Sequence, residues 1–216
     1  MGTSGNWNTY VVGTTINLAS GASVQFWNSD TALSLSSSDY VQFVFSGQVK
    51  ASGNCASMLN FPSQTAYRGL TNLFRDCTGL LTAPKLPTLR LGGYCYTGMF
   101  RGCTALVKAP ELPATDIAAY CYNGMFQDCS SLTQTQKILP ATSLKTFCYA
   151  SMFNGCSSLI TAPYLPATTL QSNCYNSMFH SCISLVNPPA ALPATTLATF
   201  CYNSMFNGCS SLTSIP

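Results

Sequence analysis

Charge is the scarcest property of this sequence. Asp, Glu, Lys and Arg make up only 7% of the 216 residues, whereas ordinary soluble domains carry roughly 25%. The net charge of +3 comes from nine scattered Lys and Arg residues, so we expect no nucleic-acid partner. Hydrophobic residues nevertheless reach 47%, which is enough to bury a core and excludes an intrinsically disordered chain.

Long apolar runs are missing as well. No stretch approaches the ~18 apolar residues that indicate a membrane span. The first residues, MGTSGNWNTYVVG, lack the basic and apolar regions of a secretory signal. We therefore expect neither a membrane span nor a signal peptide in this chain.

The side chains that carry acid–base chemistry are few. The only histidine, His180, occupies a repeat position that holds other polar residues elsewhere. The six acidic residues form no local pair that would suggest acid–base work, and no glycine-rich phosphate loop is present. We predict a protein that is not an enzyme and needs no cofactor. A Ser/His/Asp or Cys/His site assembled in three dimensions stays open.

Cysteine, by contrast, is abundant, with twelve residues. Ten of them form pairs eight residues apart: Cys95/Cys103, Cys121/Cys129, Cys148/Cys156, Cys174/Cys182 and Cys201/Cys209. This C-x7-C spacing with a single histidine differs from the close pairs of zinc sites, so we predict no metal site.

The pairs reveal an internal repeat, because successive pairs are offset by 26, 27, 26 and 27 residues. Such a period lies in the range of leucine-rich repeats. It predicts an α+β repeat fold, a leucine-rich-repeat-like solenoid with one short extended segment and one short helix per repeat. Repeats are expected to start near residues 80, 106, 132, 159 and 185, with a stub at 212.

The helix prediction rests on apolar spacing. Leu170, Cys174, Met178 and Cys182 recur at steps of four, and the same stripe is found in the other repeats. Tyr175 and Phe179 form a second stripe that is expected to pack against the neighbouring repeat. The residue two positions after the Phe is usually Gly, which indicates a left-handed residue that ends the helix.

Helical spacing also bears on the state of the cysteines. Two cysteines two helical turns apart lie about 12 Å apart along the axis, whereas a disulfide needs Cα atoms at roughly 4.4–6.8 Å. We therefore predict buried free thiols that stack in ladders. Disulfides between or within repeats are the alternative, as in a secreted scaffold.

The amino-terminal segment has a different pattern. NTYVV, TTINL, SVQFW and YVQFVFS alternate and are rich in β-branched and aromatic residues, so they predict strands. We expect a small all-β domain at residues 1–54 that caps the solenoid of residues 55–216. Trp7 and Trp27 are interpreted as packing residues.

The repeats carry the pattern MF-x-G-C-x-S-L, then A-P-x-L-P-A-T-T-L and C-Y-x-x-M-F. This pattern resembles the BspA-like leucine-rich repeats of bacterial surface proteins, over about residues 69–216. The amino-terminal segment is similar to the β domain that precedes such repeats. Cys55 departs from the aliphatic residue expected there, and LTQTQKILP lacks the Ala-Pro step.

The resemblance implies binding rather than catalysis. Its members are extracellular proteins, at the bacterial cell surface or associated with virions, and they adhere to a protein or glycan on a host or a neighbouring cell. The ligand is expected at exposed repeat positions, and Lys85, Lys108, Glu111, Lys137 and Tyr164 are the predicted partner-binding residues. An inert solvated face is the alternative for each of them.

Two other functions stay open. The Thr-rich PATT ladders could form an ice- or carbohydrate-binding surface, although LPTL interrupts them in the first repeat. The chain could also be a structural, self-assembling component of a phage or surface layer. A homo-oligomer formed through the carboxyl-terminal end of the solenoid is expected in that case.

Overall fold

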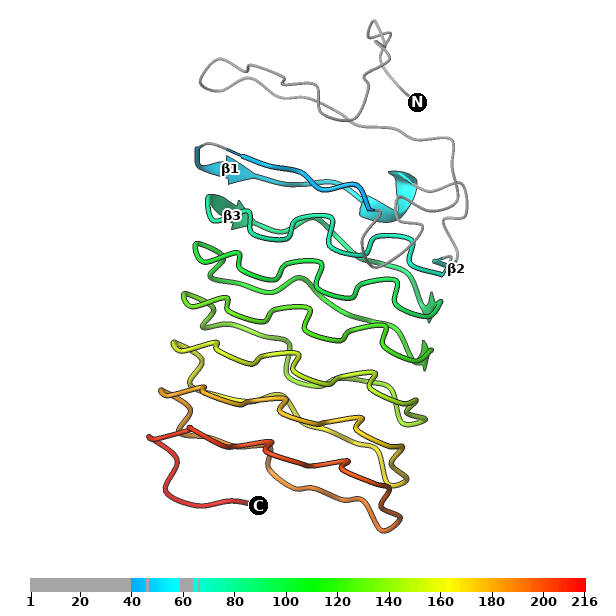
Figure 1. Cartoon of the computed structure of the whole chain (residues 1–216), viewed down its shortest axis with the longest axis vertical. Helices are drawn as coiled ribbons and strands as arrows, with labels where there is room; N and C mark the ends of the chain where they lie inside the picture. Colours follow the sequence, from blue (N-terminus) through cyan, green and yellow to red (C-terminus); the bar gives the residue numbers. More distant parts are fainter. Residues whose placement is uncertain (1–39, 46, 59–63, 66) are drawn as a thin grey trace, which may run out of the picture.

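The computed structural model describes residues 40–45, 47–58, 64–65 and 67–216. They form a stack of flattened coils with a regular repeat of 26–27 residues (Figure 1), which confirms the predicted repeat. One side of each coil is a row of consecutive turns, and the other side is extended chain. Among the described residues we find no apolar helix of membrane-spanning length.

Regular elements are short and lie where the two sides of a coil meet. Strand β1 (Val49–Lys50) pairs in parallel with β3 (Leu80–Thr82), and β4 (Arg90–Leu91) pairs in parallel with β2 (Gln64–Thr65) and β5 (Asp116–Ile117). A 3-10 helix, η1, spans Cys55–Met58. Isolated parallel bridges such as Thr161 to Asn187 continue this coil-to-coil pairing.

The turn side of each coil is a ten-residue segment that we call a turn ribbon. The six ribbons are 67–76, 93–102, 119–128, 146–155, 172–181 and 199–208. Backbone φ is positive at the second, sixth and tenth position of every ribbon, as at Tyr94 (60°), Gly98 (58°) and Gly102 (72°). Each ribbon is therefore a chain of four-residue turns.

Backbone hydrogen bonds alternate along a ribbon. The N–H groups of Tyr96, Gly98 and Phe100 donate to carbonyls of the following coil, at 2.9 Å each. The N–H groups between them close turns within the ribbon, as from Thr97 to Tyr94 O and from Met99 to Tyr96 O. Every N–H group from Tyr94 to Gly102 is thus paired, as a buried backbone requires.

The predicted helices are wrong, since no α-helix occurs in the described residues. An α-helix has 3.6 residues per turn, so positions four apart drift by about 40° at each step. The stripe Leu91, Cys95, Met99 and Cys103 keeps a spacing of four because the turn itself has four residues. The predicted left-handed glycines are confirmed, but they lie in turns rather than at helix ends.

Adjacent ribbons fit together at their tenth position, where residues with and without a bulky side chain alternate. This position is occupied, in order, by Asp76, Gly102, Asp128, Gly155, Ser181 and Gly208. A Cβ atom on Gly102 would lie 2.3 Å from Asp76 Oδ1, and one on Gly155 would lie 2.5 Å from Asp128 Oδ1. Each glycine therefore makes room for the polar side chain of the preceding coil.

Aromatic ladders fill the space between the turn side and the extended side. The rings of Phe74, Phe100, Phe126, Phe153, Phe179 and Phe206 stack with successive centroids 5.5 to 5.8 Å apart. A parallel ladder begins with Tyr96, Tyr122 and Tyr149. The predicted packing of the Tyr and Phe stripe against neighbouring repeats is confirmed.

All twelve cysteines are buried and none is in a disulfide, which agrees with the predicted thiol ladders. The second cysteine of each pair has a specific role, because its thiol donates to a Phe carbonyl of the preceding coil. Cys103 Sγ lies 3.0 Å from Phe74 O, and Cys156 Sγ lies 3.1 Å from Phe126 O. Cysteine thus combines the size of a small apolar residue with one weak donor.

Residues 40–45 and 47–58 cover the first coil. The ring of Phe43 lies 5.3 Å from that of Phe74, and the thiol of Cys77 donates to Phe43 O. Strand β1 adds its pairing to β3. The strands predicted within residues 8–27, together with Trp7 and Trp27, lie outside the described residues.

Gly102→Ala is expected to destabilise the protein by more than about 1 kcal/mol, because φ is positive and the new methyl group meets the Asp76 carboxylate. Asp76→Gly combined with Gly102→Ala should recover the steric part of this loss. Urea unfolding of the three proteins measures both effects. Gly47→Ala is the control, since a Cβ there has open space; an equal loss in this control would contradict the packing rule.

Stability is expected to fall as the pH rises above 9. Burial raises the pKa of the thiols of Cys55, Cys129 and Cys148 from 9.0 to about 12. Between these values the unfolded chain has lost protons that the folded chain keeps, so each thiol lowers the unfolding free energy by about 1.4 kcal/mol per pH unit.

Urea midpoints recorded on both sides of pH 9 test this slope. Cys129→Ala should show a shallower dependence than the unmodified chain. A midpoint that does not change across this range would show that the thiols are not buried.

Candidate binding groove

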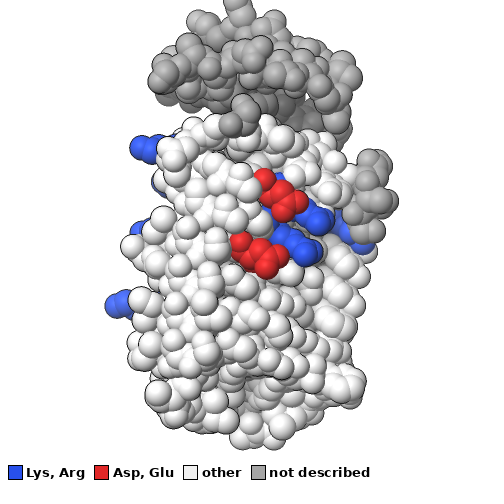
Figure 2. Space-filling model, turned by 60° about the vertical axis from the view of Figure 1, so that its left-hand side comes forward, with Lys and Arg blue, Asp and Glu red and all other residues white. Residues whose placement is uncertain are grey.

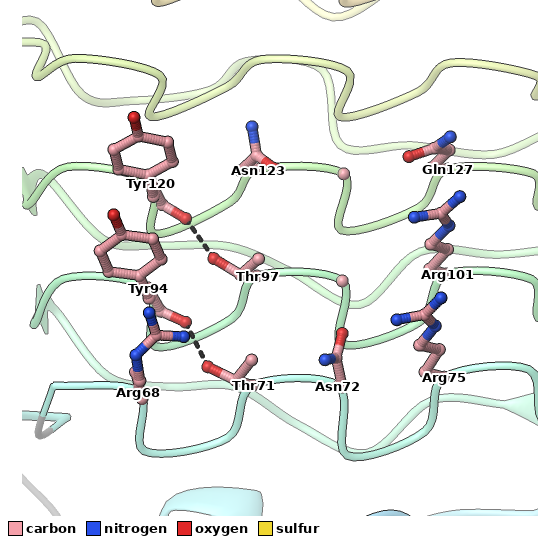
Figure 3. A pocket seen from close by; sticks show the side chains of 12 residues that line it. Arg68, Thr71, Asn72, Arg75, Tyr94, Thr97, Arg101, Tyr120, Asn123 and Gln127 are labelled. Atoms are coloured by element: carbon pink, nitrogen blue, oxygen red, sulfur yellow. Dashed lines mark hydrogen bonds between the residues drawn. The ribbon is translucent and has the colours of Figure 1, made fainter. Parts of the chain in front are cut away.

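A groove of about 330 Å³ crosses the turn ribbons of the first three coils (Figure 3). One wall consists of residues at the second ribbon position, namely Arg68, Tyr94 and Tyr120. The opposite wall consists of residues at the ninth position, namely Arg75, Arg101 and Gln127. Between them the floor is formed by Thr71, Asn72, Thr97, Gly98, Asn123 and Gly124.

The aromatic wall is a stack of rings. The centroids of Tyr94 and Tyr120 lie 4.5 Å apart with planes 4° from parallel, and Phe147 continues the stack at 4.8 Å. The guanidinium of Arg68 lies 4.3 Å from the centroid of the Tyr94 ring. Burial raises the pKa of Tyr94, and the neighbouring Tyr120 and Tyr67 add to this. The Tyr94 hydroxyl therefore stays protonated at neutral pH and can donate a hydrogen bond.

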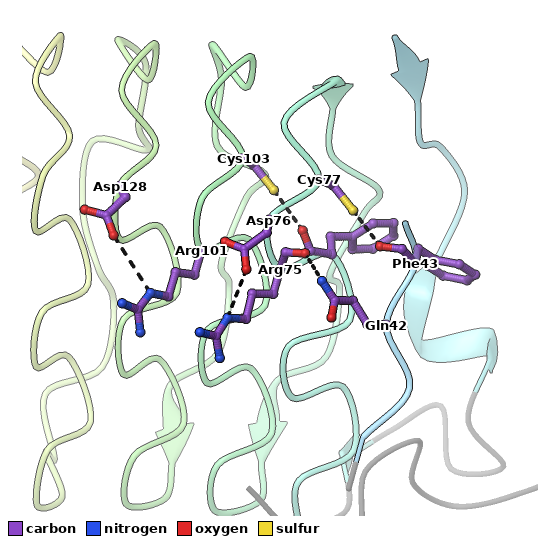
Figure 4. A network of polar contacts seen from close by, with 9 residues as sticks. Gln42, Phe43, Arg75, Asp76, Cys77, Arg101, Cys103 and Asp128 are labelled. Carbon is purple, nitrogen blue, oxygen red and sulfur yellow. Dashed lines mark hydrogen bonds and ion pairs between the residues drawn. The ribbon is translucent and has the colours of Figure 1, made fainter. Parts of the chain in front are cut away.

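The arginine wall is held from outside the groove (Figure 4). Arg75 Nε lies 3.4 Å from Asp76 Oδ2, and Arg101 Nε lies 3.8 Å from Asp128 Oδ2. Neither carboxylate lines the groove. Figure 2 shows acidic side chains against basic ones on one face that carries little other charge. The pairs orient the arginines, although exposed ion pairs add little stability.

The floor combines small and polar residues. Thr71 Oγ1 donates to Tyr94 O and Thr97 Oγ1 donates to Tyr120 O, both at 2.6 Å, so the hydroxyls tie neighbouring coils together. Gly98 and Gly124 have no side chains, and the amides of Asn72 and Gln127 lie over them: a Cβ on Gly98 would lie 2.3 Å from Asn72 Oδ1, and one on Gly124 would lie 3.2 Å from Gln127 Oε1. In the fourth coil Ser151 takes the position of these glycines. In the second and third coils the groove thus combines Gly at the sixth position with a long side chain, Arg101 or Gln127, at the ninth.

These groups can bind a ligand through hydrogen bonds and charge. The lining contains arginine, hydroxyl and amide groups but neither a carboxylate nor a histidine to exchange protons. In the described part of the chain no three His, Cys, Asp or Glu side chains are placed to hold a metal ion. His180 is half-buried and its Nδ1 lies 2.9 Å from Ser181 Oγ, away from the groove.

The binding residues predicted from the sequence lie on the extended side of the coils and do not line the groove. Lys85, Lys108, Glu111, Lys137 and Tyr164 are all exposed, as predicted. Three of them form parallel backbone bridges between coils: Lys85 with Asn54, Lys108 with Gln134 and Tyr164 with Ile138. Their role in binding stays a prediction.

Sequence reasoning missed the groove, although one signal was present. Arg101 and Gln127 belong to the variable polar position that also holds His180, and this position was interpreted as solvated surface. Gly98 stands three residues before Arg101 and Gly124 three residues before Gln127, and this combination of Gly with a long side chain marks the groove. Arg68 comes from another ribbon position and gives no periodic signal.

A scan against protein-family models found no match, and searches of curated proteins and of solved structures found no similar protein. The resemblance to BspA-like repeats therefore stays a prediction.

Thr97→Val is expected to lower the unfolding free energy by about 1 kcal/mol, or the Tm by about 2–4 °C. The variant keeps the shape of the side chain but loses the hydrogen bond to Tyr120 O. Thr115→Val, at an exposed position, is the control. Equal Tm values for the two variants in a thermal melt would show that the hydrogen bond from the Thr97 hydroxyl to the next coil does not stabilise the stack.

Proposed function

We propose that this chain is a non-enzymatic binding module, a leucine-rich-repeat-like solenoid of the BspA-like type that acts at a bacterial cell or virion surface. Its partner is a protein or glycan on a host or neighbouring cell, and the groove is its main recognition surface. The sequence resemblance supports the setting. Burial of the thiols is compatible with it, because protonated and inaccessible cysteines resist oxidation.

The observation that carries the proposal is the preorganised groove. Its side chains come from three coils whose backbones are joined by hydrogen bonds at every second residue. Asp76 and Asp128 hold two of the arginines, and ring stacking holds the tyrosines. A rigid concave site loses little entropy when it binds a ligand.

Gly124→Ser is expected to abolish recognition without unfolding the protein. Ser151 and Ser177 occupy the same ribbon position with φ of 52°, so the backbone accepts serine there. The added side chain would fill the floor of the groove. Binding of the purified protein to printed arrays of glycans and extracellular proteins, before and after the change, measures the effect.

Ser177→Gly, in a coil outside the groove, is the matched control and should bind like the unmodified chain. Light scattering on the same samples detects self-assembly, the alternative function. The proposal fails if no array feature is bound, or if every bound feature is retained by Gly124→Ser.

A further inference from the structure

Positive charge lines the groove, and the negative charge that pairs with it lies outside. Three arginines line it while the carboxylates that pair with two of them lie outside. Arg75 and Arg101 use Nε for these pairs, and no other acceptor among the described residues lies within hydrogen-bonding distance of their guanidinium groups. Their terminal nitrogens therefore remain for a ligand. A planar guanidinium fork matches carboxylate and sulfate oxygens.

Arg68 adds a positive charge from the opposite wall. It lies against the ring of Tyr94, and no carboxylate among the described residues forms an ion pair with it. Figure 3 shows Arg68 on one side of the floor and the column of Arg75 and Arg101 on the other. An anionic ligand between the walls would therefore meet positive charge on both sides.

The remaining groups suit a hydroxyl-rich chain. Asn72, Asn123 and Gln127 carry amides that can both donate and accept, and Tyr94 and Tyr120 add phenol hydroxyls. Such groups pair well with the hydroxyls of a sugar. The stacked tyrosines cover one another's faces, so they would meet a sugar with their edges and hydroxyls rather than with an open ring face.

A peptide suits the groove less well. The floor N–H groups of Thr97 and Gly98 already donate to Tyr94 O and Asn123 O, so an added strand finds no free backbone donors there. The lining also contains no Leu, Ile, Val or Met side chain to pack against an apolar peptide side chain. Both points favour a glycan over an acidic peptide.

On the basis of the function proposed above, we propose that the groove binds a linear acidic glycan, whose carboxylate or sulfate groups are held by Arg75 and Arg101. These arginines lie on adjacent coils, and paired backbones are about 4.8 Å apart, which is close to the length of one sugar ring. Three coils span about 10 Å, so the groove holds a short stretch of about two sugar units. The chain would run along the stack, across the coils.

Isothermal titration calorimetry with defined oligosaccharides tests this proposal. The probes are a heparin oligosaccharide, an oligogalacturonate, a neutral cello-oligosaccharide of equal length and a poly-glutamate peptide. We expect the acidic glycans to bind, with affinity that falls as salt is raised, and the other two probes not to bind. Preference for heparin or for oligogalacturonate distinguishes sulfate from carboxylate as the recognised group.

The variant Arg75→Gln/Arg101→Gln should weaken acidic-glycan binding by at least about tenfold, the loss expected from removing charged hydrogen bonds. Arg90→Gln is the matched control, because Arg90 also forms an exposed ion pair, 3.4 Å from Asp116, but lies outside the groove. Thermal melts of all variants verify that they fold.

Three results would overturn the proposal: no binding of either acidic glycan, equal binding of the neutral glycan, or equal binding of poly-glutamate. They can be separated from failure of the proposed function. If the unmodified chain binds a neutral glycan or a protein, and Gly124→Ser does not bind it, the proposed function stands and only the acidic-glycan proposal fails.

Discussion

The four-residue turn is the constraint on which the rest of this structure depends. One residue in four has positive φ, and this lets alternate N–H groups point along the stack while the others close the turns. Neighbouring coils are consequently fixed in register. Equivalent positions of successive repeats therefore lie above one another. The packing of the rings, the thiols and the glycines is repeated along these columns.

The columns explain a composition that is otherwise puzzling. Stacked Phe and Tyr rings supply most of the bulky core, at roughly 1.5–3 kcal/mol for a fully buried large side chain. Cysteine fits beside them because its thiol is small, apolar and able to donate to a Phe carbonyl. Gly alternates with Asp or Ser because two Cβ-bearing residues with protruding side chains do not fit in adjacent coils. Few charges are needed in a molecule held together in this way.

Much of this was predictable from the sequence, but the local conformation was not. Periodicity predicted the repeat, the aromatic columns and the exposed positions such as Lys108 and Tyr164. The free thiols were predicted from a helical spacing that the described residues do not have, so the prediction agrees with the structure although its premise was wrong. Apolar residues at every fourth position are compatible with one face of a helix. Positive φ usually marks Gly or Asn, but here Tyr94 and Phe147 have it, so the sequence does not indicate the turns. The alternation of Asp76 with Gly102 can be explained only once the structure shows that the Asp76 side chain lies against the backbone of Gly102. The groove depends in the same way on contacts between coils.

The most direct test of this account is the backbone conformation of one ribbon in solution. Nuclear magnetic resonance chemical shifts and coupling constants report φ for Tyr120, Gly124 and Asp128, and cross-hydrogen-bond couplings report the partners of the N–H groups between them. The account predicts positive φ at these three residues and bonds to residues of the next coil, as from Tyr122 N to Cys148 O. Uninterrupted helical shifts through residues 119–128, with bonds four residues apart, would contradict it.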